Sequence, residues 1–561
     1  MLRFHLKSDA LGAPWRAVAD GWEGMGGRIS VFRHRALETV ALDGGHAAAF
    51  IVRERIGGAS SERAEPETTF RSVSPDTLDA LLEEARRWRL HFTILRIDRR
   101  RDLRDPRVRI ETSPWPVAPI FLSDGQEALA GSWEPLDLYP FAAGAGLDFQ
   151  RAACFLATLD TPYGHDTLLA GVKCLTAGSS ATWQGGKGGW VLTYPPVAEA
   201  PFPRPLKPDA DVVGTFTQIL DSATRRYFGD HCPSVAAQLS GGLDSAIAAA
   251  AAMRRATTVH TYGLSVPGTT SGRQARRRAE LVERYQFKDT VIEAVASPVL
   301  GREGARMRDS RFVPWEEIYY EAFDRLNALT VQTDDIVLTG FGGNELLPPY
   351  WEEHPEAAQD HWLAPMELPQ PLSGRARQMV IAMRRDLATA PRSYLQRSTQ
   401  DAIAWSSAHF MRHGLWPYHL FATPELVKFC HSLPREWRSG RRLVREKLAA
   451  DGCSPAVAQV QITEDFSDLF SVSLRELSRP QFEQALAAER LVALDLVDGD
   501  ALRASYCDFC EGRLHEDRAD HLYAAAILEL TLATLEKASA ALPSTAPSDR
   551  TRPTTAQAPF P

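Results

Sequence analysis

The stretch PSVAAQLSGGLDSAIAAAAAMRR, residues 233–255, decides the fold class. The apolar residues 235–239 favour a short buried strand, and the alanine-rich residues 246–253 favour a helix because alanine is the best helix former. Residues 240–245, with the sequence SGGLDS, form the turn that joins them. An open α/β sheet binds its ligands at such a turn, between the carboxyl end of a strand and the start of a helix.

The residues of this turn favour an anionic ligand. Gly241 and Gly242 let the backbone approach a ligand closely and take dihedral angles that other residues avoid. The first helical turn directs N–H groups outward with the positive end of the helix dipole, and Ser240 and Ser245 add hydroxyl donors. Because a carboxylate repels phosphate unless a cation lies between them, we expect Asp244 to ligate Mg²⁺. The alternative is a serine-capped helix whose dipole favours Asp244.

Length and composition bound the class of protein. The chain has 561 residues, 44% of them hydrophobic, and a net charge of −8, so we expect more than one domain and no nucleic-acid partner. No run of about 18 apolar residues occurs, so we expect no membrane span. Seven scattered cysteines and the absence of a visible signal peptide predict a cytoplasmic protein. Cys507 and Cys510 form a CxxC motif, for which metal binding stays open.

The sequence pattern changes near residue 200. Residues 1–200 show alternating strands and hairpin signals with helices between them, which predicts an α+β arrangement of stacked sheets. The proline-rich residues 201–210 predict a linker. Residues 211–540 alternate strands and helices and then become mostly helical, which predicts an α/β parallel sheet with a helical extension. Residues 541–561, rich in Pro, Ser, Thr and Ala, predict a disordered tail.

The periodicity of apolar residues predicts the bounds of individual elements. In the first region we expect a helix at 74–90, strands at 28–33, 92–96 and 108–112, and hairpins within 125–133 and 174–194, the latter turning at 185–189. In the second region we expect helices at 213–227, 246–253 and 274–285, and strands at 235–239, 258–264, 289–292 and 335–339.

A second glycine loop, GFGGNE at residues 340–345, directly follows the expected strand 335–339. Since both glycine loops end parallel strands, we expect them to face each other across one edge of the sheet and to form a cleft for a triphosphate. Asn344 and Glu345 offer oxygen atoms, one of which could complete a magnesium shell with Asp244. The alternative is a turn whose Asn and Glu side chains are solvated.

Together these motifs resemble those of the asparagine synthetase superfamily. SGGLDS is similar to the loop of enzymes that split ATP between its α- and β-phosphates, and TGFGGNEL at 339–346 and the segment 414–448 resemble later parts of these proteins. GSWEPLDL at 131–138 and YGHDTLLAGVKCLTAGSSATW at 163–183 resemble segments of the superfamily's glutaminase-type domain. The resemblance therefore implies a glutaminase-like sandwich domain over residues 1–200, followed by an ATP-pyrophosphatase synthetase domain.

The resemblance implies ATP and Mg²⁺ as cofactors and a set of site residues. The implied ATP-binding residues are Leu239, Ser240, Gly241, Gly242, Leu243, Asp244, Ser245, Gly263, Leu264, Thr339, Gly340, Phe341, Gly342 and Gly343. The implied catalytic residues are Asp244, Glu345, Arg441 and Arg445, and the implied magnesium ligands are Asp244 and Asn344.

Departures from the superfamily pattern shape the functional hypothesis. A working glutaminase of this type has a cysteine directly after the initiator methionine, where this chain has Leu2, so we expect an inactive first domain. Phe341 stands where asparagine synthetases have glutamate and β-lactam synthetases have tyrosine, and Asn344 replaces a magnesium-binding aspartate. The lysine expected before Arg445 is Arg441 here, which still neutralises phosphate charge.

The chain is most similar in pattern to lasso peptide cyclases, the macrolactam synthetases. The resemblance implies that it adenylates an Asp or Glu side chain of a precursor peptide and closes a ring with that peptide's N-terminal amine, releasing AMP and pyrophosphate. A leader-peptide-binding protein and a protease are further possible partners. The alternatives are a β-lactam synthetase-like or other small-molecule amide synthetase, a tRNA-modifying ATP pyrophosphatase and an inactive scaffold. Since Phe341 cannot be a base, Glu316 and Glu317 are candidates for that role.

Overall fold

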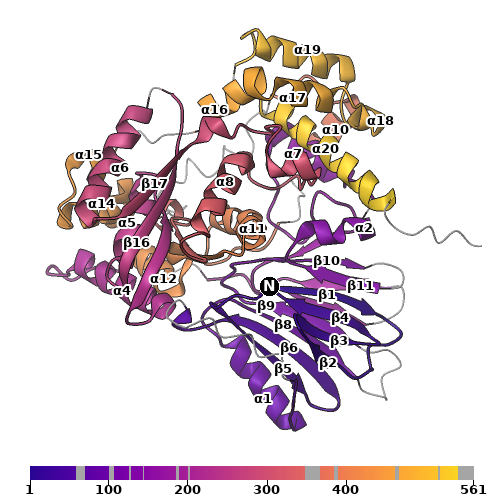
Figure 1. Ribbon diagram of the computed structural model, residues 1–561, viewed down its shortest axis with the longest axis vertical. Coiled ribbons are helices and arrows are strands. Elements are labelled where there is room, and N and C mark those ends of the chain that lie inside the picture. Colours follow the sequence, from indigo (N-terminus) through magenta and orange to yellow (C-terminus); the bar gives the residue numbers. More distant parts are fainter. Residues whose placement is uncertain are drawn as a thin grey trace, which may run out of the picture.

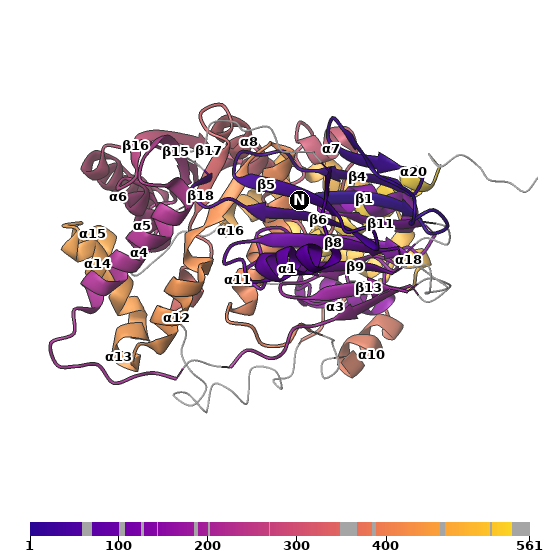
Figure 2. The same ribbon diagram turned by 90° about the horizontal axis from the view of Figure 1, so that it is seen from below.

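A computed structural model shows how the chain is arranged (Figures 1 and 2). It describes residues 1–58, 70–99, 107–124, 128–142, 144–184, 189–199, 202–268, 270–347, 367–383, 389–460, 466–515 and 519–540. The described residues form two seven-stranded sheets and one five-stranded sheet. Most of the expected turn at 185–189 and the whole of the tail 541–561 lie outside the described residues.

The two seven-stranded sheets come from residues 2–193 and pack face to face. The first has the order β12 (Lys173–Leu175), β10 (Ile120–Asp124), β11 (Ala128–Ser132), β1 (Leu2–Lys7), β4 (Gly27–Val31), β3 (Gly21–Gly24), β2 (Arg16–Val18). The second has the order β14 (Trp190–Thr193), β13 (Ser180–Trp183), β9 (Val108–Thr112), β8 (Phe92–Asp98), β6 (Ala47–Glu54), β5 (Leu37–Asp43), β7 (Phe70–Ser72). This sandwich confirms the expected stack of sheets.

Burial along the strands follows from these layers. In β1, Leu2, Phe4 and Leu6 point into the sandwich and alternate with more exposed residues, as expected for a strand with one covered face. Strand β6 is buried almost continuously, because the sandwich core covers one face and α1 (Pro75–Arg86) covers the other. The rings of Trp22 and Phe50, 5.0 Å apart, join the two sheets across the core.

One hairpin expectation is wrong in part. Strands β13 and β14 pair as expected, but β12 pairs with β10 in the other sheet, so the segment 174–194 crosses between the two sheets. The crossing occurs at a tight turn in which Ser179 N–H donates to the Thr176 carbonyl (3.0 Å) and Gly178 takes a φ of +69°. The alternation of apolar and polar residues, interrupted by glycine, is the same for a hairpin within one sheet and for a segment that crosses between two sheets, so the sequence does not distinguish them.

The third sheet is parallel, as expected. Its order is β17 (Lys288–Glu293), β16 (Ala256–Ser265), β15 (Cys232–Gln238), β18 (Ile336–Thr339), β19 (Trp416–His419). Strand β19 lies in a region that the sequence predicted to be mostly helical. It is an edge strand of four residues containing Pro417, and proline is a signal against a central strand, so its pattern gave no strand prediction.

Helices cover both faces of this sheet (Figure 1). Those near it are α4 (Val212–Phe228), α5 (Leu243–Ala252), α6 (Ser271–Tyr285), α8 (Tyr320–Thr330), α11 (Arg397–Arg412), α12 (Pro424–Ser432), α13 (Arg435–Arg438), α14 (Arg442–Ala450) and α15 (Pro455–Ala458). The others are α2 (Tyr139–Ala142), α3 (Phe149–Thr158), α7 (Ala305–Asp309), α10 (Gly374–Met383), α16 (Ser467–Val472), α17 (Arg479–Leu486), α18 (Arg490–Ala493), α19 (Gly499–Cys510) and α20 (Asp520–Ala540). Helix α20 packs against α2, α3 and α17.

The sandwich meets the parallel sheet at the amino ends of β18 and β19. Trp416 Nε1 donates to the Glu54 carboxylate (2.8 Å), and burial raises the pKa of Glu54 to about 7. Arg35 forms ion pairs with Asp334 (2.5 Å) and Asp335 (2.6 Å). The carboxyl ends of the parallel strands, where ligands bind, are therefore left free of this contact.

Two further sequence expectations concern the linker and membrane-spanning helices. Residues 202–210 form neither helix nor strand and are exposed. In the part of the chain that the structure describes, no helix combines the length and apolar character that crossing a membrane requires.

Candidate active site

The two glycine loops lie side by side at the carboxyl edge of the parallel sheet. Strands β15 and β18 are hydrogen-bonded neighbours, so the loops that follow them meet. A Cβ atom added to Gly340 would lie 3.1 Å from the backbone nitrogen of Ser245, and one added to Gly343 would lie 2.2 Å from Cγ of Asp244. The expectation that the loops face each other is confirmed, and the contact leaves no room for side chains at these glycines.

The first loop is held by its own serines. Ser245 Oγ accepts a hydrogen bond from the Ser240 N–H (3.1 Å), and Ser240 Oγ accepts one from the Gly242 N–H (3.2 Å). Gly241 has a φ of +88°, which favours glycine. Gly242 has a φ of −83°, so the expectation that both glycines take dihedral angles closed to other residues is wrong for Gly242. Its N–H is fixed by Ser240 at the start of α5.

A cavity of about 410 Å³ opens over the two loops. The sequence-predicted residues that line it are Leu239, Ser240, Gly242, Leu243, Asp244, Ser245, Gly263, Leu264, Gly340, Phe341, Asn344 and Arg441. Lining residues that the sequence analysis missed are Gln238, Tyr262, Val266, Gln274, Phe323, Leu326 and Phe466. The structure thus brings most of the predicted residues to one cavity, although they come from four separate segments.

The remaining predicted residues do not line the cavity; they are Gly241, Thr339, Gly342, Gly343, Glu345 and Arg445. The Glu345 carboxylate accepts a hydrogen bond from Ser398 Oγ (2.8 Å). Arg445 Nε donates to the Gly440 carbonyl (2.8 Å), which holds the turn before α14. In the described residues, these two predicted catalytic side chains therefore bond to neighbouring protein groups.

The missed lining residues carried no distinctive sequence signal. Phe323 and Leu326 are three residues apart on α8, a spacing that indicates an ordinary core stripe. Gln274 lies on α6, and its amide donates to the carbonyls of Ser240 (3.1 Å) and Leu264 (3.2 Å). Gln274 therefore ties the first loop to the end of β16. Only the packing of α6 and α8 over the sheet places these side chains at the cavity.

Arg441 joins the two predicted magnesium ligands. Its guanidinium donates to the Asp244 carboxylate and to Oδ1 of Asn344 (2.8 Å). Burial raises the pKa of Asp244 to about 6, although the Arg441 charge opposes this shift, and Glu345 raises the pKa further. Arg441 has a φ of +60° at the start of α14, directly after the kink at Gly440. Three groups predicted to handle metal and phosphate therefore converge on one point.

The cavity wall at Phe341 is apolar. The Phe341 ring stacks on His419 with centroids 5.5 Å apart and planes 11° apart. Burial lowers the pKa of His419 to about 3, and its Nδ1 shares a hydrogen bond with Thr339 Oγ1 (2.7 Å), so the ring is neutral. Neither candidate base lines this cavity. Glu316 forms a buried ion pair with Arg412 (2.7 Å) beside a different cavity, and Glu317 is exposed.

Residues 216–534 match the family model described as asparagine synthase. The match covers more than half of the chain. The chain belongs to the asparagine synthase family. The family's enzymes are ATP-dependent amide-bond ligases, and this chain is an ATP-dependent ligase of that kind. No curated protein matches the chain.

The asparagine synthase match includes every residue that lines the 410 Å³ cavity. It begins within α4 and ends within α20, so both glycine loops, β19 and Arg441 lie inside it. The sandwich of residues 2–193 lies outside it. The match therefore supports ATP as a substrate of this part of the chain and does not extend to the sandwich.

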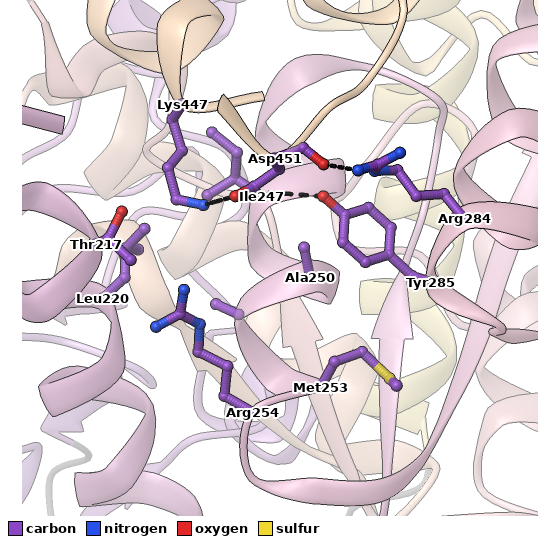
Figure 3. A pocket seen from close by; sticks show the side chains of 11 residues that line it. Thr217, Leu220, Ile247, Ala250, Met253, Arg254, Arg284, Tyr285, Lys447 and Asp451 are labelled. Carbon is purple, nitrogen blue, oxygen red and sulfur yellow. Dashed lines mark hydrogen bonds and ion pairs between the residues drawn. The ribbon is translucent and has the colours of Figure 1, made fainter. Parts of the chain in front are cut away.

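A second cavity, of about 430 Å³, lies among α4, α5, α6 and α14 (Figure 3). Arg254, Arg284 and Lys447 line it, and Lys447 is paired with Asp451. It lies beside the C-terminal part of α5, whereas the first glycine loop precedes the N-terminus of that helix. It contains none of the sequence-predicted site residues.

The raised pKa of Asp244 predicts that the enzyme loses activity at acidic pH. Only the ionised carboxylate ligates a cation, so kcat/KM for ATP should fall with a one-proton slope as pH drops through about 6. Because the Arg441 charge lowers the pKa of Asp244, Arg441→Met should move this midpoint to higher pH. Arg442→Met, which removes a guanidinium paired with Glu446, should keep the wild-type midpoint. A midpoint that Arg441→Met leaves unmoved would contradict the assignment.

Proposed function

We propose that the chain is a lasso peptide macrolactam synthetase, in which ATP activates a side-chain carboxylate of a peptide and the peptide's own N-terminal amine closes the ring. The observation that carries this proposal is that Phe341 lines the cavity and stacks on His419, which does not line it and whose pKa burial lowers to about 3. The phenyl ring cannot accept a proton, and an imidazole with so low a pKa is a weak base. A peptide N-terminal amine, with a pKa of about 8, is a strong nucleophile and needs less help from a base than an amide nitrogen or a carbanion.

ATP is proposed to bind at the glycine loops. The N-terminus of α5 would hold its phosphates, and the first loop, whose Ser240 and Gly242 N–H groups bond to its own serines, would shape the backbone around them. The apolar side chains of Leu243, Phe323, Leu326 and Phe466 give the other walls of the cavity a surface that suits a flat aromatic base. The cavity volume of about 410 Å³ is in the range of small-molecule sites.

The donor set fits a magnesium ion. Asp244 and Asn344 present oxygen atoms to the same guanidinium, so the two oxygens face one point, and hard oxygen donors are the ligands of Mg²⁺. When bound, Mg²⁺ would neutralise phosphate charge and so assist the departure of pyrophosphate. Arg441, released from Asp244, would add a second positive charge toward the phosphates.

The proposed reaction consists of two successive displacements. A carboxylate oxygen of the peptide attacks the α-phosphorus of ATP, and the bond to pyrophosphate breaks. The N-terminal amine then attacks the activated carbonyl carbon, the carbon–oxygen bond to AMP breaks, and the amine releases a proton. The enzyme contributes chiefly by holding amine and carbonyl together, which replaces an encounter in solution by a step within one molecule.

The sandwich is proposed to be a glutaminase-like domain without glutaminase activity. Its cysteines are Cys154 and Cys174, both buried. Burial raises the pKa of the Cys154 thiol to about 11 and that of the Cys174 thiol further, so neither forms the thiolate that acts as a nucleophile. We expect the purified protein to release no glutamate from glutamine and to form no product that depends on glutamine. Glutamate release that Cys154→Ser abolishes would contradict this assignment.

The function is tested with ATP, Mg²⁺ and candidate core peptides, which a short precursor gene near this one would supply. The expected product is lighter than the peptide by one water, and AMP and pyrophosphate form in equal amounts with it. Acetylating the peptide N-terminus, or changing its ring-forming Asp or Glu to Asn or Gln, should abolish the loss of water. Changes to its other acidic residues should not. If the enzyme instead joins ammonia or a small amine to a free amino acid, it is a small-molecule amide synthetase.

A further inference from the structure

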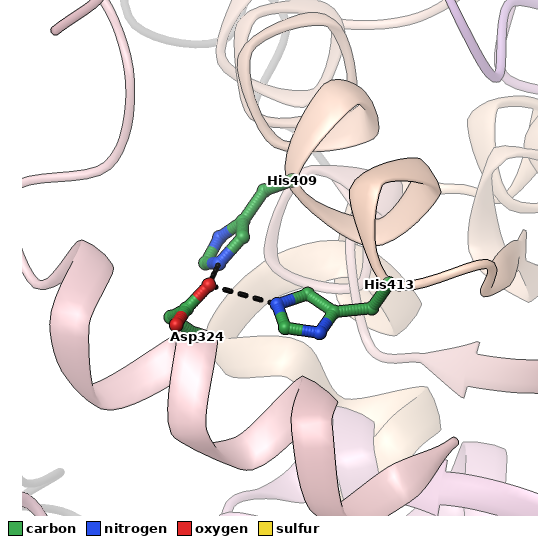
Figure 4. A group of neighbouring side chains, drawn as sticks. All are labelled: Asp324, His409 and His413. Atoms are coloured by element: carbon green, nitrogen blue, oxygen red, sulfur yellow. Dashed lines mark hydrogen bonds and ion pairs between the residues drawn. The ribbon is translucent and has the colours of Figure 1, made fainter. Parts of the chain in front are cut away.

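Two helices beside the ATP cavity bring together a carboxylate and two imidazoles. Asp324 lies on α8, His409 on α11, and His413 directly after α11 (Figure 4). Their candidate ligand atoms all lie within 4.8 Å of one another. The two histidines are four residues apart, a spacing that places both on one face of a helix and that zinc sites use. None of the three lines the ATP cavity.

The two distances from the histidine nitrogen atoms to the Asp324 carboxylate are close to those of a tetrahedral metal site. Nε2 of His409 lies 3.4 Å and Nε2 of His413 lies 2.8 Å from the same Asp324 oxygen, Oδ1. Zinc–nitrogen and zinc–oxygen bonds near 2.1 Å, at tetrahedral angles, place neighbouring donor atoms about 3.4 Å apart. The first distance already has this value, and the second needs an opening of roughly half an ångström. Figure 4 shows both rings directed at the carboxylate.

The burial of His409 supplies a second indication. Its side chain is 5% exposed, and in the described residues its Nε2 has only the long 3.4 Å contact with Asp324, without the geometry of a full hydrogen bond. The ring is held in place by stacking on Tyr320, with centroids 4.1 Å apart. A buried polar atom left without a hydrogen bond costs free energy, so native structures rarely keep one without a reason. A metal bond at Nε2 would supply that reason.

The charges and the solvent exposure around the three residues are compatible with a bound cation. Arg412 lies between the two histidines in the sequence, but Glu134 (2.6 Å) and Glu316 (2.7 Å) neutralise its charge. Asp324 and His413 are each about one-fifth exposed, which gives an ion and a water molecule access to the site. The site therefore combines one buried ligand with two that solvent can reach.

We propose that Asp324, His409 and His413 bind one Zn²⁺ ion, with a water molecule as the fourth ligand. Two imidazoles and one carboxylate form a borderline donor set that zinc prefers and magnesium does not. The ion would link α8, which supplies Phe323 and Leu326 to the ATP cavity, to α11. At the start of α11, Ser398 contacts the second glycine loop through Glu345. The proposed ion therefore braces a helix that lines the active-site cavity, α8, against a helix that contacts the second glycine loop, α11.

The test uses the full-length protein, stripped of metal with a chelator and titrated with Zn²⁺, and with Co²⁺ as a coloured probe. We expect about one ion per chain, the intense visible absorption of tetrahedral Co²⁺, and a higher melting temperature with Zn²⁺ than without it. His413→Ala and Asp324→Asn, at partly exposed positions, should each weaken binding by more than the ~10–100-fold that loss of an outer-shell partner costs. The matched control is Cys507→Ser with Cys510→Ser, which removes the other candidate ligands and should bind as wild type does.

The proposal is overturned if the stripped protein takes up no Zn²⁺, if both ligand variants bind it as tightly as wild type, or if the double cysteine variant abolishes binding. All readouts are made without ATP or peptide. A failure here therefore says nothing against the proposed ligase reaction, and a failure of that reaction says nothing against the metal site.

Discussion

An Asp244→Asn variant is expected to lose ATP turnover by about a thousandfold or more. The substitution keeps the size and hydrogen-bonding oxygen of the side chain and removes its charge. Without that charge the site would hold Mg²⁺ far less tightly, because Asn344 offers only a neutral carbonyl oxygen. Turnover is measured as AMP and pyrophosphate formed with a peptide substrate, and near-wild-type turnover by the folded variant would contradict the assignment.

The same variant is expected to be no less stable than wild type at neutral pH. Burial raises the pKa of Asp244 in the folded protein to about 6, above its ordinary value of 3.8. An ionised carboxyl group whose pKa is raised by folding lowers the free energy of unfolding. This loss of stability grows as pH rises from the pKa of the unfolded state through the pKa of the folded state. Asparagine carries no such cost, so the melting temperature should stay equal or rise. A clear fall would show that the pair with Arg441 stabilises the fold more than burial destabilises the carboxylate.

Gly343→Ala is expected to lower turnover by about a hundredfold, although Gly343 does not line the cavity. Its φ of −66° and ψ of −39° suit alanine, so the backbone does not oppose the change. The obstacle is the added Cβ, which would lie 2.2 Å from Cγ of Asp244 and would push the carboxylate from its place. Displacement of a reacting or ligating group by about 1 Å is enough for such a loss.

Gly374→Ala is the matched control for this substitution. Gly374 begins α10, and a Cβ added there would meet no atom within 4 Å. Activity and melting temperature should therefore stay at wild-type values. If Gly343→Ala is as active as this control, Asp244 has freedom to move and the close contact of the two loops does not position it.

The strand–loop–helix pattern was predictable because it is local. The apolar run before SGGLDS and the alanine run after it predict β15 and α5 to within a few residues. The second loop was predictable for the same reason, and two loops after parallel strands must share an edge of the sheet. These inferences need no knowledge of which residues pack together over long distances.

The features that sequence reasoning missed depend on long-range packing. The four-residue strand β19 exists because Trp416 and its neighbours pair with β18 and pack on the sandwich, against the preference of Pro417. Asp244 and Arg441 are 197 residues apart, and only the fold shows that they share a hydrogen bond. The direction of Glu345 toward Ser398 likewise follows from the placement of α11.

The most direct test of the account follows the oxygen atoms of the peptide. A core peptide whose ring-forming carboxylate carries oxygen-18 is incubated with the enzyme, ATP and Mg²⁺, and the nucleotide and phosphate products are analysed by mass spectrometry. If the carboxylate is adenylated at the glycine loops, each ring closure transfers one labelled oxygen to AMP, and pyrophosphate stays unlabelled. Label in inorganic phosphate with formation of ADP, or cyclisation without transfer of label, would contradict the account.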